Sequence, residues 1–249
     1  MSGPETMVVA GQAGNVDPAE REKFDALASS WWDPEGDSRP LHEINPARVR
    51  FVRERCALGE ARVVDVGCGG GILSEALARE GAQVTGLDVA ERALAVARLH
   101  LHESGLSVDY LGATAEDHAQ AAPGSADVVT CMELLEHVPD PVSVVRACSR
   151  LLRPGGNLFL STLNRTPAAF ALAIVGAEHV ARLVPRGTHR YDRFIRPSEL
   201  AGWLRGCGLE VLEITGLHYN PVSRAASLGG NVSVNYLVHA RKPEGATAS

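Results

Sequence analysis

Short β-branched runs alternate with amphipathic stretches through the middle of the chain. The runs predict strands at 62–66, 83–89, 107–111, 127–132 and 157–162. Helical spacing of apolar positions predicts intervening helices at 72–80, 91–104 and 141–152. Strand, helix and strand repeated in this way imply parallel pairing with right-handed crossovers. The pattern therefore predicts an α/β fold built on a doubly wound sheet.

The two ends of the chain extend this picture. Asp17 followed by Pro18, with Glu20 at the capping-box position, predicts a helix that ends at Trp31, Trp32 and Pro34. Further elements are expected as a helix at 197–207 and strands at 209–217 and 231–240, the last pair antiparallel. Residues 1–16 and 243–249 lack periodicity and are expected to be a frayed tail and a frayed C-terminus around one domain, 17–242.

Composition excludes several classes of protein. The 249 residues carry 24 basic and 30 acidic side chains, a net charge of -6, which argues against a nucleic-acid binder. The five cysteines form no C-x-x-C pair, and this usage favours a reducing, cytoplasmic compartment. No apolar run approaches the roughly 20 residues that span a bilayer. A soluble enzyme or a small-molecule binding module fits these features.

A glycine-rich turn joins the first predicted strand to its helix. Gly67, Gly69 and Gly71 alternate there, so the backbone can approach a ligand closely. A dinucleotide fingerprint needs glycine where Ile72 stands, which disfavours an NAD-dependent oxidoreductase. Asp88 ends the second strand, where an acid can accept hydrogen bonds from ribose hydroxyls. The pair of features predicts an adenosine site.

Several longer stretches carry a resemblance to a known family. They are 15–17, 31–33, 41–46, 65–71, 130–141, 161–165 and 215–221. The chain resembles the class I S-adenosylmethionine-dependent methyltransferases, and within them the ubiquinone-biosynthesis O-methyltransferase family. That resemblance implies a Rossmann-like seven-stranded sheet, mostly parallel with an antiparallel last strand. It also implies S-adenosyl-L-methionine as co-substrate and transfer to phenolic hydroxyls of polyprenyl-phenol and catechol intermediates, ubiquinone precursors.

The resemblance further implies which residues hold the methyl donor. Its donor contacts match Arg48, Gly67, Asp88 and Met132. An arginine can bind the donor carboxylate with two hydrogen bonds, and a methionine can pack on adenine. Gly69 belongs to the same turn. Without the resemblance, the favoured interpretation of Arg48 is a solvated helix charge among Arg50, Arg53 and Arg55.

Asp65 is a further candidate donor contact. It ends the first predicted strand, directly before the glycine turn. A carboxylate at that place can bond to loop amides or to the donor's ammonium group. Both interpretations stay open at this point.

Glu133, Glu136 and His137 follow directly on the fourth predicted strand. Their spacing would place all three on one face of a helical turn. They are candidates for cation ligands, for a general-base group or for ordinary charges at a helix start. The resemblance implies a divalent metal, Mg²⁺, although the histidine leaves room for Zn²⁺ or Mn²⁺. We expect these three residues to be catalytic, with a bound cation lowering the pKa of the phenol and His137 as the alternative proton acceptor.

An apolar and then basic insert is expected at 166–190, near the active site. The apolar part, 168–177, is too short to cross a bilayer, and five arginines follow it: Arg182, Arg186, Arg190, Arg193 and Arg196. A helix of this kind can lie in an anionic membrane interface, which predicts a peripheral protein on the inner face of the membrane. A buried helix covering the active site is the alternative.

Other residues and functions stay open at this stage. The acceptor pocket is expected to include His189, Tyr191, His218, Tyr219 and Asn220. Other ubiquinone-biosynthesis enzymes are candidate partners. A methyltransferase of another small phenol or amine is one alternative function. A non-catalytic module that binds the donor within a biosynthetic complex is another.

Overall fold

The computed structural model describes residues 14–172 and 190–245. Within these residues, a single mixed sheet of eight strands has the order β3-β2-β1-β4-β5-β8-β6-β7. The strands are β1 Arg62–Val66, β2 Gln83–Asp88, β3 Val108–Gly112, β4 Ala126–Met132, β5 Leu152–Leu163, β6 Glu210–Asn220, β7 Ala225–Gly229 and β8 Asn235–Arg241. The first five strands pair in parallel, and β8 joins β5 and β6 antiparallel.

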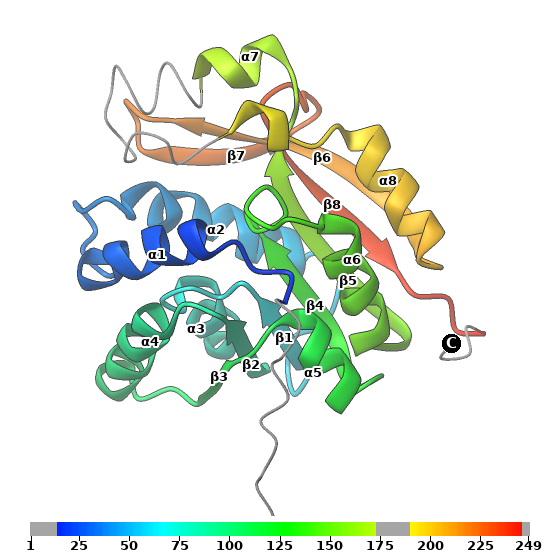
Figure 1. Ribbon diagram of the computed structural model, residues 1–249, viewed down its shortest axis with the longest axis horizontal. Coiled ribbons are helices and arrows are strands. Elements are labelled where there is room, and N and C mark those ends of the chain that lie inside the picture. Colours follow the sequence, from blue (N-terminus) through cyan, green and yellow to red (C-terminus); the bar gives the residue numbers. More distant parts are fainter. Residues whose placement is uncertain (1–13, 173–189, 246–249) are drawn as a thin grey trace, which may run out of the picture.

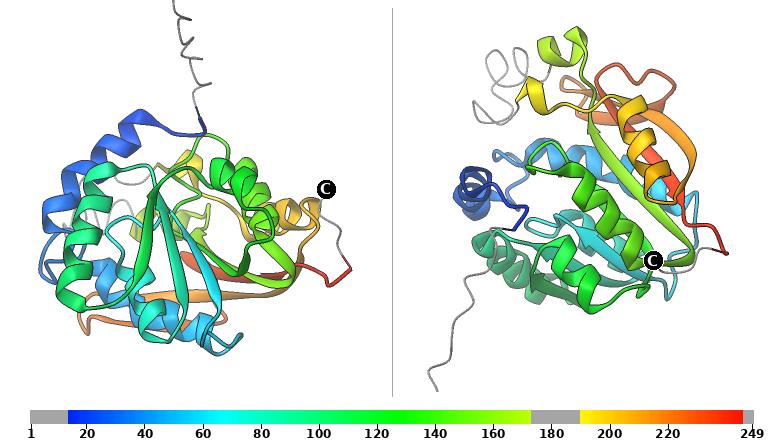
Figure 2. Two further views of the ribbon diagram at one scale, coloured as in Figure 1. Left: turned by 90° about the horizontal axis from the view of Figure 1, so that it is seen from below. Right: turned by 45° about the vertical axis from the view of Figure 1, so that its right-hand side comes forward.

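Helices cover both faces of this sheet (Figures 1 and 2). They are α1 Pro18–Leu27, α2 Arg39–Arg53, α3 Ile72–Arg79, α4 Glu91–Ser104, α5 Ala115–Ala121, α6 Pro141–Leu151, α7 Pro167–Ala169 and α8 Pro197–Gly206, with short 3-10 turns at Ala28–Ser30 and Tyr191–Arg193. One core cluster packs α2, α3 and α4 against the sheet, and another packs α5, α6 and α8 against the opposite face. The result is a three-layer doubly wound fold.

The predicted doubly wound α/β class and the antiparallel pairing of the last strands are confirmed. The expected number of seven strands is wrong, because β7 forms an additional edge strand paired antiparallel with β6. Its sequence, Ala-Ala-Ser-Leu-Gly, contains no β-branched residue, so the hydrophobic pattern does not reveal it. Helices α2 and α5 were also not predicted.

Three segments lie outside the described residues: 1–13 of the predicted tail, 173–189 of the insert and 246–249 of the predicted C-terminus. Asn15, at the end of the predicted tail, hydrogen-bonds the Glu116 side chain at 3.0 Å and the backbone of Asp140 at 2.7 Å. Along the described ranges, no helix is long and apolar enough to cross a membrane.

Candidate active site

A cavity of about 670 Å³ opens at the carboxyl ends of β1, β2, β4 and β5. This edge of an open α/β sheet is where such folds bind ligands. All nine predicted site residues line the cavity: Arg48, Asp65, Gly67, Gly69, Asp88, Met132, Glu133, Glu136 and His137. The fold therefore brings together residues from α2 and from three neighbouring strand ends.

The glycine turn and the acid after β2 meet directly. The Asp88 carboxylate accepts a hydrogen bond from the Gly69 backbone N–H at 2.8 Å and another from Ala90 N–H at 2.8 Å. Burial raises the pKa of Asp88, and these backbone donors oppose the shift by stabilising its ionised form. Gly69 has a φ of +54°, and a Cβ there would lie 2.3 Å from Cζ2 of Trp31. Glycine is therefore required both by the backbone and by the indole that covers the turn.

Asp65 is bound by hydroxyl groups. Ser74 and Thr130 each donate to one of its carboxylate oxygens at 2.6 Å. The side chain is buried, and burial raises its pKa. The expected contact with loop amides is replaced by these two hydroxyls, while a contact with an ammonium group of the donor stays a prediction.

Arg48 lies inside the molecule, so the solvated-charge interpretation is wrong. Only 4% of Arg48 is exposed, and its Nη1 donates to Glu133 at 2.7 Å. Nη2 donates to the Asn45 side chain at 3.0 Å and to the Leu41 carbonyl at 3.2 Å. Among the described residues, its buried Nε has no hydrogen-bond partner. An unpaired buried N–H costs free energy that a hydrogen bond would recover.

The acidic turn after β4 is not helical, which corrects the expectation of one shared helical face. Glu133 adopts a left-handed φ of 52°, and the turn closes when His137 N–H donates to the Leu134 carbonyl at 2.9 Å. Ser161 donates to Glu133 at 2.6 Å, and Thr162 donates to buried Glu136 at 2.8 Å. Burial raises the pKa of Glu136. Glu133 and Glu136 thus each accept a hydrogen bond from a different hydroxyl group of the protein.

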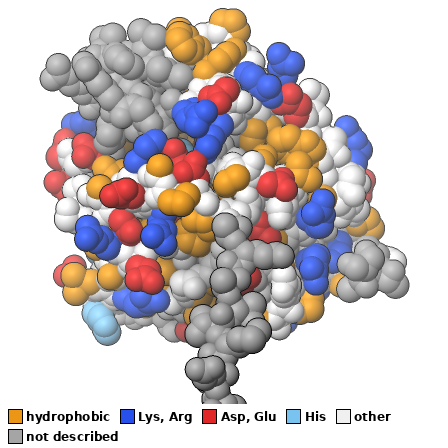
Figure 3. Space-filling model, viewed as in Figure 1, with side chains coloured by type: hydrophobic (Ala, Val, Ile, Leu, Met, Phe, Trp, Pro, Cys, Tyr) orange, Lys and Arg blue, Asp and Glu red, His pale blue; other side chains and the backbone are white. Residues whose placement is uncertain are grey.

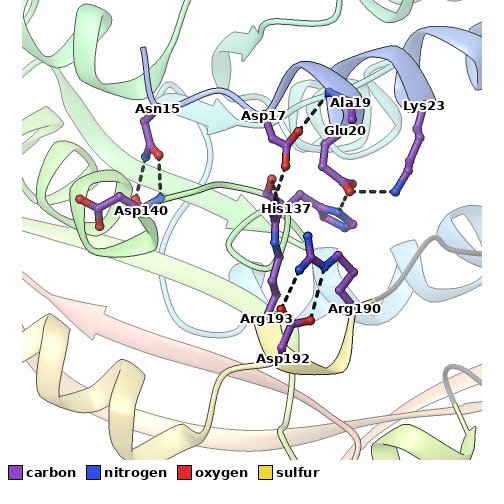
Figure 4. Close-up of polar contacts among 10 residues, drawn as sticks. All are labelled: Asn15, Asp17, Ala19, Glu20, Lys23, His137, Asp140, Arg190, Asp192 and Arg193. Atoms are coloured by element: carbon purple, nitrogen blue, oxygen red, sulfur yellow. Dashed lines mark hydrogen bonds and ion pairs between the residues drawn. The ribbon is translucent and has the colours of Figure 1, made fainter. Parts of the chain in front are cut away.

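The third member of that turn contacts the N-terminal helix, as Figure 4 shows. His137 Nδ1 lies 2.9 Å from the Glu20 carboxylate, which also accepts from Lys23 at 2.8 Å. Hydrogen bonds from these two partners lower the pKa of Glu20 to about 2. Asp17, directly before α1, accepts a hydrogen bond from Arg193 at 2.8 Å. This second contact also holds the start of the N-terminal helix in place. Sequence reasoning assigned Glu20 to a capping box and missed this role.

The other end of the cavity is mainly apolar. Its lining includes Leu163, Leu172, Leu217, His218, Tyr219, Val234 and Asn235. The Tyr219 hydroxyl donates a hydrogen bond to the Glu43 carboxylate. Burial, and to a smaller extent this carboxylate, raises the pKa of Tyr219 to about 12. Of the predicted acceptor residues, His218 and Tyr219 line the cavity, Tyr191 and Asn220 do not, and His189 lies outside the described residues.

Comparison with known proteins identifies the fold and the family. Residues 40–214 match the family described as "Methyltransferase domain". Magnesium protoporphyrin IX methyltransferase from Synechocystis, solved with bound SAH, superposes with a TM-score of 0.66 at 18% identity, covering 89% of this chain and 94% of that one. The fold and the family match define a methyltransferase domain of the S-adenosylmethionine-dependent class.

Similarity to curated proteins is more specific. A ubiquinone biosynthesis O-methyltransferase from Pseudomonas aeruginosa is 57% identical, covering 92% of this chain and 98% of the relative. The protein of the same name from Sodalis glossinidius is 59% identical and covers 92% of each chain. This chain belongs to the ubiquinone biosynthesis O-methyltransferase family.

Proposed function

We propose that this protein transfers the methyl group of S-adenosylmethionine to a phenolic hydroxyl of polyprenylated ubiquinone precursors. The observation that carries the proposal is one continuous cavity with a nucleoside-type end, at Gly69 and Asp88, and an apolar end beyond Glu133. Relatives named for this reaction, at 56–59% identity, supply the substrate class. We assign the ribose to Asp88, the donor carboxylate to Arg48 and the adenine to the Met132 surface.

The reaction is an in-line displacement. The phenolic oxygen attacks the donor methyl carbon, the new O–C bond forms as the C–S bond breaks, and the electron pair stays on sulfur. Because the sulfonium donor is already activated, holding the two reactants in line supplies much of the rate.

The acceptor proton needs a base, and we assign that role to His137. Only 10% of its side chain is exposed, and it lines the cavity. When Nδ1–H donates to Glu20, Nε2 is the unprotonated nitrogen and can accept the phenolic proton. The ionised Glu20 carboxylate then stabilises the imidazolium that forms.

Binding of Mg²⁺ by Glu133, Glu136 and His137 stays a prediction of the resemblance. Within the described residues, no three His, Cys, Asp or Glu side chains are placed to hold a metal ion. Arg48, 2.7 Å from Glu133, would also repel a cation at that carboxylate. The arrangement does not fit a preformed three-ligand site, and the mechanism above assigns no step to a metal.

We also propose peripheral contact with anionic lipid. Phe170 and Leu172 follow directly after α7 and are 44% and 60% exposed, and Leu172 also lines the cavity. Figure 3 shows hydrophobic side chains over α7 with Lys or Arg side chains beside them. Arg190 and Arg193 are paired with Asp192 and Asp17, so their charges are partly neutralised. Flotation with anionic and neutral liposomes tests this, and equal absence from both lipid fractions would exclude it.

An acceptor panel tests the proposed function. Purified protein and S-adenosylmethionine are incubated with a short-chain polyprenyl catechol, with unprenylated catechol and with a primary amine, each with and without chelator. We expect methyl transfer to the prenylated catechol, and reduced turnover without the prenyl chain. Transfer to the amine alone would favour the alternative methyltransferase, and donor binding without any transfer would favour a non-catalytic module. Loss of turnover in chelator, restored by Mg²⁺, would support the metal prediction.

A further inference from the structure

The loop that carries His137 is held at both ends by the N-terminal segment. Residues 137–140 form the last part of the connection between β4 and α6. At one end of this loop the Glu20 carboxylate lies 2.9 Å from the His137 imidazole. At the other end the Asn15 side chain bonds the backbone N–H and the carbonyl of Asp140, each at 2.7 Å. The position of the loop therefore depends on residues more than a hundred positions earlier in the chain.

Arg193 makes a further contact with this loop, and it acts on the backbone of His137 itself. Its Nη1 donates to the His137 carbonyl at 3.3 Å, and its Nη2 donates to the Asp17 carboxylate at 2.8 Å. Figure 4 shows Arg193 reaching Asp17 beside His137. The side chains of Asp17 and Arg193 are each 22% exposed, so their attraction is partly shielded from water. One guanidinium thus joins the start of α1 to the backbone of the proposed base.

Helix α1 completes a closed set of contacts around His137. The second carboxylate oxygen of Asp17 caps α1, and three positions later the same helix presents Glu20 to the His137 imidazole. Phe24 packs edge-on against that imidazole, with ring centroids 5.1 Å apart. Arg193 therefore fixes the His137 backbone relative to the helix that fixes the His137 side chain.

Both attachments matter for a proton acceptor. A base must lie within hydrogen-bond reach of the proton it removes, and a misplacement of about 1 Å can cost about 100-fold in rate. We propose that Arg193 is a positioning residue: by holding the His137 carbonyl to the Asp17 end of α1, it keeps Nδ1 on Glu20 and leaves Nε2 as the proton acceptor. This inference rests on the proposed function and deepens it, because it assigns the arrangement of the base to a residue outside the cavity lining.

An acceptor that needs no base separates positioning from folding. Wild type and Arg193→Met are assayed with a short-chain prenyl catechol and with its nitro-substituted analogue, whose hydroxyl is already ionised at the assay pH. With the prenyl catechol, Arg193→Met should lower kcat about tenfold at unchanged KM, because a displaced base loses part of the roughly 100- to 10,000-fold that such a group contributes. With the nitro analogue, its kcat should equal that of wild type. The matched control Arg205→Met removes an exposed arginine of α8 and should behave as wild type with both acceptors.

Two more variants test the link to Asp17. Asp17→Asn keeps an oxygen that can cap α1 but loses the charge that Arg193 contacts. It should lower kcat in the same way, and its effect should not add to that of Arg193→Met. Arg193→Lys keeps a charged donor at this position and should recover part of kcat. The Kd for S-adenosylhomocysteine should equal that of wild type in every variant, because the cavity lining is unchanged.

The outcomes distinguish this inference from the proposed function. Wild-type kcat for Arg193→Met with the prenyl catechol, or an equal loss with both acceptors, would overturn the inference and leave the proposed function intact. If Arg193→Met loses donor binding through misfolding, the same comparison of acceptors with Asp17→Asn decides. A wild-type protein that methylates neither acceptor would overturn the proposed function and this inference with it.

Discussion

Replacing Arg48 by methionine removes both its contact with Glu133 and its proposed contact with the donor. Measurements of stability and of ligand binding then separate the two effects. The guanidinium contacts Glu133 at 2.7 Å, Asn45 at 3.0 Å and the Leu41 carbonyl at 3.2 Å, and only 4% of Arg48 is exposed. Breaking a buried ion pair costs about 3–5 kcal/mol. We expect about 3 kcal/mol for Arg48→Met, because the Glu133 side chain is 18% exposed and water compensates part of the loss. That corresponds to a Tm lower by about 6–12 °C.

Ligand binding then isolates the role of Arg48 in holding the donor carboxylate. A charge-assisted hydrogen bond is worth about 1.5–3 kcal/mol, so Kd for S-adenosylhomocysteine should rise by about 10- to 150-fold. Methylthioadenosine has the same nucleoside but no amino-acid tail, and calorimetry should show its Kd unchanged. The double variant Arg48→Met, Glu133→Gln removes both charges and should recover most of the stability but not the affinity. Equal weakening of both ligands would refute the assignment.

Three further predictions concern the glycine turn, Asp88 and His239. Gly69→Ala should lower the free energy of unfolding by about 3 kcal/mol in urea titrations, because a left-handed alanine is strained and its Cβ would lie 2.3 Å from Trp31. Asp88→Asn should raise Kd for S-adenosylmethionine by about 10- to 150-fold in calorimetry, since the carboxamide loses one accepting oxygen and its charge. Burial lowers the pKa of His239 to about 4, so the folded state keeps this imidazole neutral while the unfolded state protonates it below about pH 6.5. Stability should therefore fall as pH drops from about 6.5 toward 4, and His239→Gln should flatten that part of the denaturation profile.

Much of the sheet could be predicted because local patterns determine it. The strand at 62–66 and the helix at 91–104 have the predicted bounds, since each contains a full run of one hydrophobic period. Helix α2 was not predicted: it contains Pro46 in its interior, where proline normally ends a helical pattern. The buried position of Arg48 follows from α2, so it could not be read from the surrounding arginines.

The site was harder to predict where it depends on contacts between distant segments. Sequence spacing indicated that Glu133, Glu136 and His137 belong to one site, and they do line one cavity. It could not give their partners, because the left-handed φ of Glu133 breaks the expected helical turn. The contact of His137 with Glu20 joins residues 117 positions apart. No local pattern carries that information.

Transfer of an isotopically labelled methyl group in a single turnover tests the central claim most directly. Enzyme in excess over labelled S-adenosylmethionine is mixed with a short-chain polyprenyl catechol, and the product is examined for the atom that carries the label. The account predicts label on one phenolic oxygen, and a slower transfer with the Asp88→Asn protein at the same donor concentration. Label on any other atom, or a donor that stays intact while bound beside the catechol, would contradict it.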